Sequence, residues 1–501
     1  MVIQFSSIDL RSIRINKDHQ ETIFSQLCRG LRELILAAKL PVESRLPSTR
    51  MLAAELGVSR ISVREAYEQL VAEGFLISIA GRGTFVGNDN GLKRAILAFN
   101  NAKSANNQSA EQSLHRDISS RAKAFLSVSQ SNVIPEALPF NPATPDFSEF
   151  PWSKWNSTVK KSMLEHKYEA MDYGDPEGFP ALRGALAHYL GLARGINCQP
   201  EQIVITASSE QTIRRTAFLL LDPKDSVWFG EPGMYTRRNA FCSLGVNTLT
   251  VPVDESGVVV SAVYDYGKKA KLAYVLPYRH YPIGITMSLS RRHELLDWAT
   301  KNDAWILEDD YASEFGLPDH SPPTIQSLDT DQRVIYMGGF SLTLFPALRL
   351  SYAVFPKPLA DAAIHIARSE MAVSSVLQPA LAEFITRDHY ITHIRKMRKV
   401  YKRREDFLVQ YLQQHIGPES SISGIRGGTN IVLNLPPQYS AIEISRKLAQ
   451  QDIIAHPISS YYLNKPTGQK SRNGLVLGFA CASRMKLQKA ATVMLDLMGH
   501  Q

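Results

Sequence analysis

The sequence has few cysteines and no long apolar run, and both absences narrow the class of protein. Its 501 residues include only four cysteines, which stand far apart and form no CxxC pair. Such spacing argues against a disulfide framework or a structural zinc site and suits a reducing compartment. No run approaches the roughly 18 apolar residues of a membrane span, and the start of the chain lacks the features of a signal peptide. We therefore expect a cytoplasmic protein with no membrane partner.

Metal-binding patterns and a strong charge excess are also missing. None of the 13 histidines stands in an HExxH or comparable spacing, so we assign no metal site. Lysines and arginines number 56 against 48 acidic residues, a net charge of +8. This balance permits a nucleic-acid partner but does not require one. The length exceeds that of one ordinary domain, so two or more hydrophobic cores are expected.

Three regions differ in composition. Residues 1–88 combine short helical patterns with glycines, and residues 89–137 are rich in small polar side chains. Residues 138–501 alternate strand-like apolar runs with helical patterns, which is typical of an α/β fold. We predict a first domain over 1–88, a linker over 89–137, which has too few apolar residues for a core, and a large domain over 138–501.

The first domain is predicted to contain three helices and a β-hairpin. The helices are expected at residues 21–38, 49–56 and 60–73, and the strands at 75–79 and 84–86. Ser48 and Ser59 directly precede the second and third helices and are suited to cap them. Two capped helices joined by a short turn and followed by a hairpin form the winged helix-turn-helix pattern.

The side chains of this domain are suited to duplex DNA. The third helix offers Arg60, Ser62 and Arg64 from its first turns, where they can reach bases and phosphates. Any one arginine alone is equally consistent with a solvated face, and the ordered combination favours DNA. The candidate DNA-binding residues are Arg45, Ser48, Arg50, Ser59, Arg60, Ser62, Arg64, Arg82, Gly83 and Thr84.

Four segments of this domain carry a family resemblance. They run from Arg45 to Arg50, from Leu56 to Val63, from Ala72 to Leu76 and from Gly81 to Val86. Together they resemble the GntR-type winged helix over about residues 20–87. The usual wing reads Gly-Ser-Gly-Thr, so Arg82 is a departure that adds a charge where a groove would lie.

The large domain carries several motifs in a fixed order. They are Tyr173 to Gly178, the strand 203–206 with the turn 208–212, the strand 305–307 with Glu308 to Tyr311, and the segment from Gly339 to Tyr352. A turn that leads from a strand into a helix, such as 208–212, is of the kind that binds phosphate. Ligands of open α/β sheets lie at the carboxyl ends of strands, as Glu308 to Tyr311 would.

These motifs resemble a fold-type I, pyridoxal-phosphate-dependent aminotransferase. With the first domain they resemble the MocR subfamily of GntR regulators over nearly the whole chain. The resemblance implies an α/β fold: a winged helix-turn-helix, a large mixed-sheet α/β subdomain and a smaller C-terminal α+β subdomain. It also implies a head-to-tail homodimer that binds double-stranded DNA and a small-molecule effector.

The resemblance also assigns cofactor roles to individual residues. Asp309 matches the aspartate at the pyridine nitrogen, and Tyr311 matches the tyrosine near the ring oxygen. At the position of Met234 the family usually has an aromatic ring that stacks on the cofactor, and the ring of Tyr235 could replace it. The implied cofactor-binding residues are Ser209, Tyr235, Asp309, Tyr311, Ser341 and Arg349, the last two matching the residues that hold the phosphate.

One position departs from the family in a decisive way. The family places the Schiff-base lysine directly after the motif serine, Ser341, and this sequence has Leu342 there. Leucine has no amine, so we expect no catalytic residue and a pyridoxal phosphate that is bound non-covalently or lost. Ala207 and Glu210 also replace a small neutral turn, and Glu210 would place a negative charge near a phosphate.

Three functions remain after this comparison of residues. The first is a DNA-binding regulator whose non-catalytic aminotransferase-like domain senses a small ligand. The second is a working transaminase with an appended DNA-binding module, against which Leu342 argues because the lysine both tethers the cofactor and transfers the proton. The third is a regulator whose large domain only dimerises.

Overall fold

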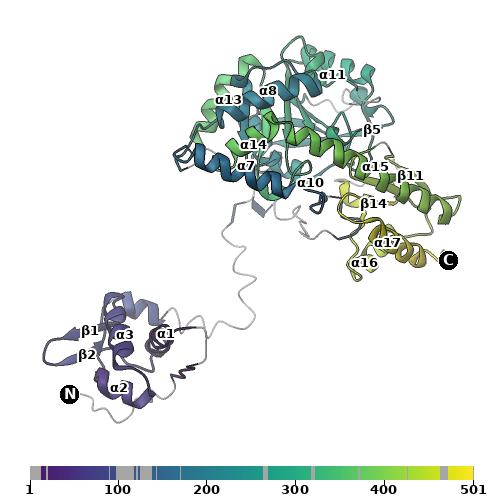
Figure 1. Ribbon diagram of the computed structural model, residues 1–501. Helices are drawn as coiled ribbons and strands as arrows, with labels where there is room; N and C mark the ends of the chain where they lie inside the picture. The colour runs from purple at the N-terminus through teal and green to yellow at the C-terminus, as the bar shows by residue number, and fades with distance from the viewer. Residues whose placement is uncertain are drawn as a thin grey trace. The chain divides into compact units, whose positions relative to one another are not determined.

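The fold is described from a computed structural model of the chain. The described residues are 13–17, 21–89, 91–97, 118–119, 122–123, 138–142, 144–169, 171–262, 269–316, 322–370, 373–425, 427–462 and 472–499. The chain divides into two compact units, residues 1–119 and 120–501 (Figure 1). The predicted linker, 89–137, lies largely outside the described residues, so its boundaries stay predictions.

The first unit contains the predicted helices and hairpin. Its elements are α1 (Ile23–Leu36), α2 (Thr49–Leu56), α3 (Arg60–Ala72), β1 (Leu76–Ile79) and β2 (Gly83–Val86). The apolar faces of the helices meet in one core that includes Leu27, Leu31, Val63 and Leu70. This unit therefore has a hydrophobic core of its own.

Caps set the starts of the two central helices. The Ser48 hydroxyl accepts a hydrogen bond from the Met51 amide at 3.3 Å, and the Ser59 hydroxyl accepts one from the Ile61 amide at 3.1 Å. Gly57 ends α2 with φ of +63°, a conformation that favours glycine. These contacts turn the chain sharply between α2 and α3, as a helix-turn-helix requires.

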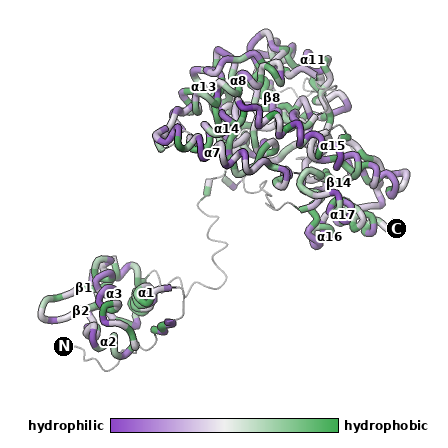
Figure 2. The backbone as a smooth tube through the Cα atoms, viewed as in Figure 1, coloured by the Kyte–Doolittle hydropathy of each residue, from purple (hydrophilic) through white to green (hydrophobic). Residues whose placement is uncertain are grey.

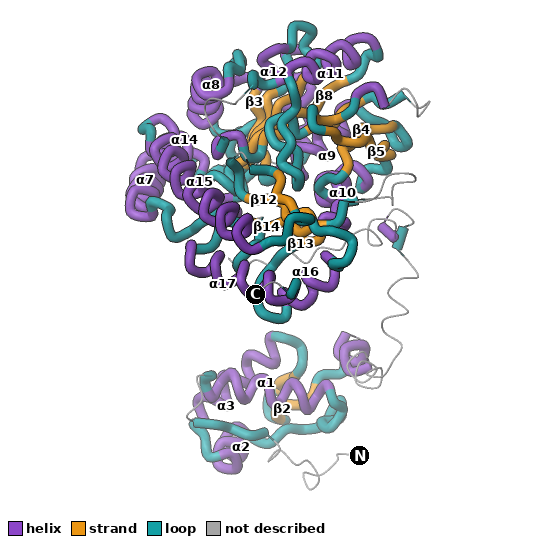
Figure 3. The backbone as a smooth tube through the Cα atoms, turned by 90° about the vertical axis from the view of Figure 1, so that its right-hand side faces the viewer, coloured by secondary structure: helices purple, strands orange, loops and turns teal. Residues whose placement is uncertain are grey.

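The second unit is built on a mixed eight-stranded sheet with the order β3-β10-β9-β8-β7-β4-β5-β6. The strands are β3 (Ile203–Thr206), β4 (Ser226–Glu231), β5 (Asn247–Asp254), β6 (Gly257–Val258), β7 (Leu272–Val275), β8 (Trp305–Asp310), β9 (Val334–Gly339) and β10 (Ser351–Val354). The five strands from β9 to β5 are parallel, whereas β10 is antiparallel to both of its neighbours. Figure 3 shows this sheet inside the unit, with helices around it.

Helices cover both faces of the sheet, as the alternation of side chains along a strand requires. Leu307 packs in the core beneath α9 (Ser209–Leu220), α10 (Tyr235–Cys242) and α13 (Lys357–Ser369). Its neighbour Ile306 packs on the opposite face, in the core beneath α11 (Leu289–Lys301) and α12 (Ile325–Leu328). Consecutive side chains of β8 therefore lie in two separate cores, one on each face of the sheet.

Four further helices complete the part of this unit around the large sheet. They are α7 (Trp152–Glu165), α8 (Pro180–Arg194), α14 (Gln378–Thr386) and α15 (His389–His415). The long helix α15 contacts α14 and also α17 of the C-terminal subdomain. Seven lysines and arginines stand between residues 393 and 405 of this helix, along which polar and apolar residues alternate (Figure 2).

The C-terminal subdomain is smaller and has an α+β architecture. A four-stranded antiparallel sheet has the order β11-β12-β14-β13. Its elements are β11 (Ser421–Ser423), β12 (Asn430–Asn434), α16 (Ala441–Ala449), β13 (His456–Pro457), β14 (Gly474–Gly478) and α17 (Arg484–Leu497). Within the described residues, no helix has both the length and the apolar character needed to cross a membrane.

Candidate functional site

The first candidate site is the exposed side of α3 and the hairpin. Arg60 and Arg64 are exposed in the first turns of α3, while Ser62 between them is half-buried. Arg64 has only a loose contact with Glu68, at 3.8 Å between two exposed side chains. Both arginines are therefore available to an outside partner.

A neighbouring segment brings another arginine to the hairpin. Residues 43–46 run beside β2, with the Leu46 amide donating to the Thr84 carbonyl at 2.9 Å. A Cβ placed on Gly83, whose φ is +111°, would be 3.1 Å from Nε of Arg45. The Arg45 side chain thus passes close to the hairpin tip, where Arg82 is also exposed.

The sequence analysis did not single out an apolar residue on this surface. Ile61 is 58% exposed in the first turn of α3, beside Arg60. It contributes nothing to the core, so its apolar surface faces solvent or a partner. An isoleucine in this position can contact the methyl group of a thymine. The signal in the sequence was an apolar residue off the buried face formed by Val63, Ala66 and Leu70.

The second candidate site lies at the carboxyl end of β8, where three acidic residues follow one another. Asp309 points to the face covered by α9 and α10, as Leu307 does, while Glu308 and Asp310 point to the opposite face. All three are buried. Burial of charge is costly unless each group is paired, so their partners define the chemistry of this region.

Asp309 is held by a phenol and a guanidinium. Its Oδ2 accepts a hydrogen bond from the Tyr274 hydroxyl at 2.6 Å and one from Nε of Arg237 at 3.3 Å. Burial raises the pKa of Asp309, against the opposing effects of Arg237 and Tyr274. The Arg237 side chain is only 14% exposed. Burial acts against its charge, but the carboxylates of Asp309 and Glu210 outweigh burial and raise the pKa of Arg237.

Glu210 completes this group, which we call the Glu210–Arg237–Asp309 triad. Its Oε1 accepts a hydrogen bond from Arg237. Glu210 stands in the first turn of α9, whose N-cap is Ser208. Burial opposes its charge, but the Arg237 guanidinium outweighs burial and lowers the pKa of Glu210. A carboxylate therefore occupies the positive end of a helix.

The predicted cofactor residues lie at strand and helix ends around this triad. Ser209 begins α9, Tyr235 begins α10, and Tyr311 follows β8. A Cβ on Gly339, the last residue of β9, would be 3.9 Å from the Ser209 hydroxyl, so the start of α9 lies near the end of β9. The phenolic oxygen of Tyr311 is buried without a hydrogen-bond partner among the described residues.

The remaining predicted positions lie in the turn between β9 and β10. Ser341 and Arg349 are exposed, and the turn is closed by the Phe340 amide, which donates to the Leu350 carbonyl at 3.2 Å. Leu342 is half-buried and packs against the largest hydrophobic core. No amine therefore stands at the position that follows Ser341.

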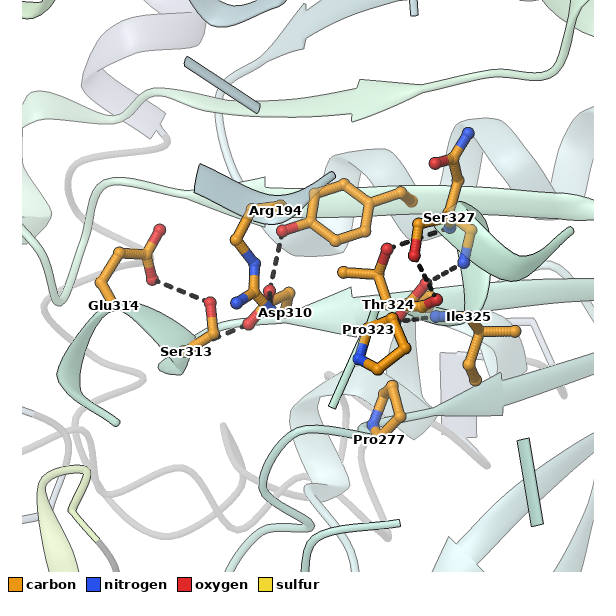
Figure 4. Close-up of polar contacts among 12 residues, drawn as sticks. Arg194, Pro277, Asp310, Ser313, Glu314, Pro323, Thr324, Ile325 and Ser327 are labelled. Atoms are coloured by element: carbon orange, nitrogen blue, oxygen red, sulfur yellow. Dashed lines mark hydrogen bonds and ion pairs between the residues drawn. The ribbon is translucent and has the colours of Figure 1, made fainter. Parts of the chain in front are cut away.

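The opposite face of β8 holds a separate polar network (Figure 4). Oδ2 of Asp310 accepts hydrogen bonds from Arg194 at 2.6 Å and from the Tyr336 hydroxyl at 2.8 Å. The carboxylate of Glu308 accepts the amides of Ile325 and Gln326 at 3.0 and 2.8 Å, which caps the start of α12. Burial raises the pKa of Glu308 to about 7. These hydrogen bonds hold the end of β8 in place on the face of the sheet opposite Asp309.

The C-terminal subdomain contacts the segments around Gly233 and Tyr281. The hydroxyls of Tyr281 and Tyr461 lie 3.0 Å apart, and the Gly233 amide donates to the Tyr461 carbonyl at 2.9 Å. The buried guanidinium of Arg279 donates to the Gly424 carbonyl at 2.8 Å. His280 shares a hydrogen bond of 2.7 Å with the Pro232 carbonyl. Within the described ranges, no group of three or more His, Cys, Asp and Glu side chains could hold a metal ion.

The residues present do not fit pyridoxal phosphate. The carboxylate expected to pair with the pyridinium already binds a guanidinium, and the start of α9 holds a carboxylate where a phosphate would need positive or neutral groups. Leu342 adds the absence of an amine. Among the described residues, the buried and unpartnered hydroxyl of Tyr311 still matches a ring ligand.

Two residues of the triad region were not singled out as site residues in the sequence. Arg237 precedes Asp309 by 72 positions and Tyr274 precedes it by 35, so no local pattern links them. The one available signal was Glu210, an acidic residue in a turn that resembles a phosphate site. A half-buried acid in such a place is stabilised by a cation, and Arg237 supplies it.

Comparisons with known protein families agree with the two units. Residues 24–86 match the bacterial regulatory proteins of the gntR family, and residues 148–492 match aminotransferase class I and II. The fold is also that of solved aminotransferases. A kynurenine aminotransferase from Pyrococcus horikoshii superposes with a TM-score of 0.66 at 23% identity, over 78% of this chain and 96% of that one. The fold and the matches define a class of protein that joins a GntR-type helix-turn-helix to a fold-type I aminotransferase domain.

Full-length relatives specify the family further. The chain is 32% identical to the probable rhizopine catabolism regulatory protein MocR of Rhizobium meliloti, over 93% of this chain and 92% of the relative. It is 28% identical to the pyridoxine biosynthesis transcriptional regulator PdxR of Corynebacterium glutamicum, over 93% and 94% of the two chains. The chain belongs to the GntR/MocR-type transcriptional regulators with an aminotransferase-like domain.

Proposed function

We propose that this protein is a cytoplasmic, sequence-specific DNA-binding regulator whose aminotransferase-like domain does not catalyse transamination. The winged helix of residues 1–88 binds duplex DNA, residues 89–137 link it to the large domain, and residues 138–501 sense a small-molecule effector and form a head-to-tail homodimer. The observation that carries the DNA-binding part is the exposed, capped start of α3, where neither Arg60 nor Arg64 forms a close ion pair with another described residue.

Each predicted DNA-binding residue has a role in this proposal. Arg60, Ser62 and Arg64 approach base edges in the major groove, and the helix starts at Ser48 and Ser59 offer amides to phosphates. Arg50 contacts the backbone. Arg45, Arg82, Gly83 and Thr84 belong to the hairpin region, which can enter a minor groove because glycine adds so little bulk.

The DNA-binding part is tested by selecting bound sequences from a random duplex pool with the full-length protein. The selected duplex should bind far more tightly than random DNA, and its affinity should fall steeply with salt because counterions are released from phosphates. Equal affinity for selected and random duplexes would contradict the proposal.

The absence of catalysis is supported by Leu342. A transaminase needs an amine that tethers the cofactor and moves a proton, and the half-buried leucine supplies neither. Incubation with pyridoxal phosphate and a mixture of amino acids should give no keto acid above a protein-free control. Turnover by the purified protein would favour the alternative of a working transaminase.

The homodimer is supported by exposed apolar side chains in and after α7. Leu164, Tyr168, Met171 and Tyr173 are each more than two-thirds exposed. An apolar patch of this kind marks an interaction surface, and a dimer would place two winged helices on two half-sites.

A further inference from the structure

We infer that the side chains of Glu210 and Arg237 occupy the place of pyridoxal phosphate in this protein, the carboxylate in the phosphate position and the guanidinium in the position of the pyridinium. The large domain is then assembled around an internal ion pair and works without the cofactor. This inference deepens the proposed non-catalytic role and rests on it, since Leu342 leaves no amine for covalent attachment.

The cationic half of the substitution is seen at Asp309. An aspartate in this position holds a protonated ring nitrogen in the family that the fold resembles. Here its Oδ2 is 3.3 Å from Nε of Arg237 and 2.6 Å from the Tyr274 hydroxyl, and the carboxylate is only 2% exposed. The guanidinium supplies the positive charge that a pyridinium would supply, and it does so from the protein itself.

The anionic half is seen at the start of α9. Glu210 belongs to the first turn of α9, and the positive end of a helix is where a phosphate binds. Its Oε1 accepts a hydrogen bond from Arg237. One carboxylate therefore complements the positive end of the helix and pairs with the guanidinium.

Pyridoxal phosphate and this pair exclude each other. The phosphate dianion would meet the carboxylate of Glu210, and the protonated ring would meet the guanidinium of Arg237, so like charges would face each other at both ends of the ligand. Arg237 cannot simply leave, because Asp309 would then be a buried carboxylate without a cation. Loss of one charge of the pair weakens this exclusion, and loss of both removes it.

A double variant tests this arrangement. Glu210→Gln with Arg237→Leu removes both charges, so Asp309 lacks a cation and the start of α9 lacks an anion. The probe is pyridoxamine 5′-phosphate, which has the ring and phosphate of the cofactor but no aldehyde and therefore does not attach to surface lysines. Arg238→Leu is the matched control, because Arg238 is the next residue of α10 and donates to Thr248 at 2.8 Å, outside the triad.

Binding of the probe to the full-length proteins is measured by calorimetry and by thermal shift. The double variant should bind it at least about tenfold more tightly than the native protein, a change of 1.4 kcal/mol. The Arg238→Leu variant should bind like the native protein. The proposal is overturned if the native protein binds the probe as tightly as the double variant, or if the folded double variant gains no affinity.

A conservative variant keeps the proposal testable if the double variant does not fold. Glu210→Gln alone preserves the side-chain shape at a site that is 30% exposed. It should bind the probe more tightly than the native protein, and inorganic phosphate should compete. Unchanged affinity in this variant overturns the proposal. Selected-DNA binding and keto-acid production, measured on the same samples, report separately on the proposed function.

Discussion

At the scale of single residues, the buried carboxylate of Asp309 depends on Arg237 for its neutralising charge. We predict that Arg237→Met lowers the free energy of unfolding by about 3 kcal/mol, because removal of one partner leaves buried acids unpaired. Arg238→Met removes a neighbouring arginine that donates a hydrogen bond to Thr248, outside the triad, and it should cost less than about 1 kcal/mol. Urea denaturation measures both. Equal losses in the two variants would mean that the triad does not stabilise the fold.

Leu342 gives a second prediction at this scale. Leu342→Lys restores the amine that the family uses, but Arg237 and Glu210 still occupy the charged positions. We therefore expect no pyridoxyl adduct at position 342 after incubation with pyridoxal phosphate and borohydride reduction. The adduct should appear when Leu342→Lys is combined with Glu210→Gln and Arg237→Leu. Peptide mass mapping makes the comparison, and an equal yield in the single variant would show that the pair is no obstacle.

His280 gives a prediction about pH. Burial lowers the pKa of His280 from 6.5 to about 4. The unfolded chain therefore binds a proton at a higher pH than the folded chain, and stability is lost as the pH falls from about 6.5 towards 4. The loss from this group amounts to about 3 kcal/mol. In urea titrations, His280→Gln should be less sensitive to pH in this window than the native protein. His393 titrates similarly in both proteins, so parallel curves would contradict the assignment to His280.

The residue scale also shows where prediction from the sequence stops. Asp309 could be found because it stands just after the apolar run 305–307, and Leu342 because it follows a motif serine. Arg237 and Tyr274 could not, since their only link to Asp309 is the sheet and helix arrangement. Side chains that meet only through tertiary structure leave no periodic signal.

At the scale of elements, apolar periodicity and capping residues predicted most of the helices and strands. The second helix was predicted at its observed bounds, 49–56, because Ser48 and Gly57 mark both ends. The first begins at Ile23 rather than residue 21, because Thr22 caps it by accepting from the Ser25 amide. The strand β8 runs past its apolar residues to Asp310. Its acidic residues are buried and paired, so hydrophobicity alone ended the predicted strand too early.

The helix α3 gives the prediction that belongs to this scale. Arg60→Ala should reduce the preference for a selected duplex over random DNA by roughly 1–3 kcal/mol if Arg60 makes a bidentate base contact. The control is Arg29→Ala, which removes an arginine of α1 that pairs with Glu21 at 2.7 Å. Fluorescence anisotropy with both duplexes measures the preference. A uniform loss on both duplexes would instead make Arg60 a phosphate contact.

At the scale of the whole molecule, two units with separate cores share one chain, so the proposed function requires that a signal pass from the ligand-binding unit to the DNA-binding unit. The first unit has its own core around Leu27 and Val63. In the proposed homodimer, the large domain sets how two winged helices are paired. Control of pairing is a route from a ligand site to DNA affinity that needs no catalysis.

The proposed homodimer gives the last prediction. Leu164 is 69% exposed and Met171 87% exposed, so Leu164→Glu with Met171→Glu should leave the core intact while charging the apolar patch. We expect the native protein to scatter light with about twice the chain mass of 55.9 kDa and the double variant to shift towards one chain mass. Ile442→Glu, which charges an exposed apolar residue of α16, should remain dimeric.

The monomeric variant should also lose affinity for a duplex with two half-sites while keeping its affinity for a single half-site, because only pairing is removed. A native protein that is monomeric at micromolar concentration would contradict the dimer. A dimeric double variant would place the interface elsewhere on the large domain.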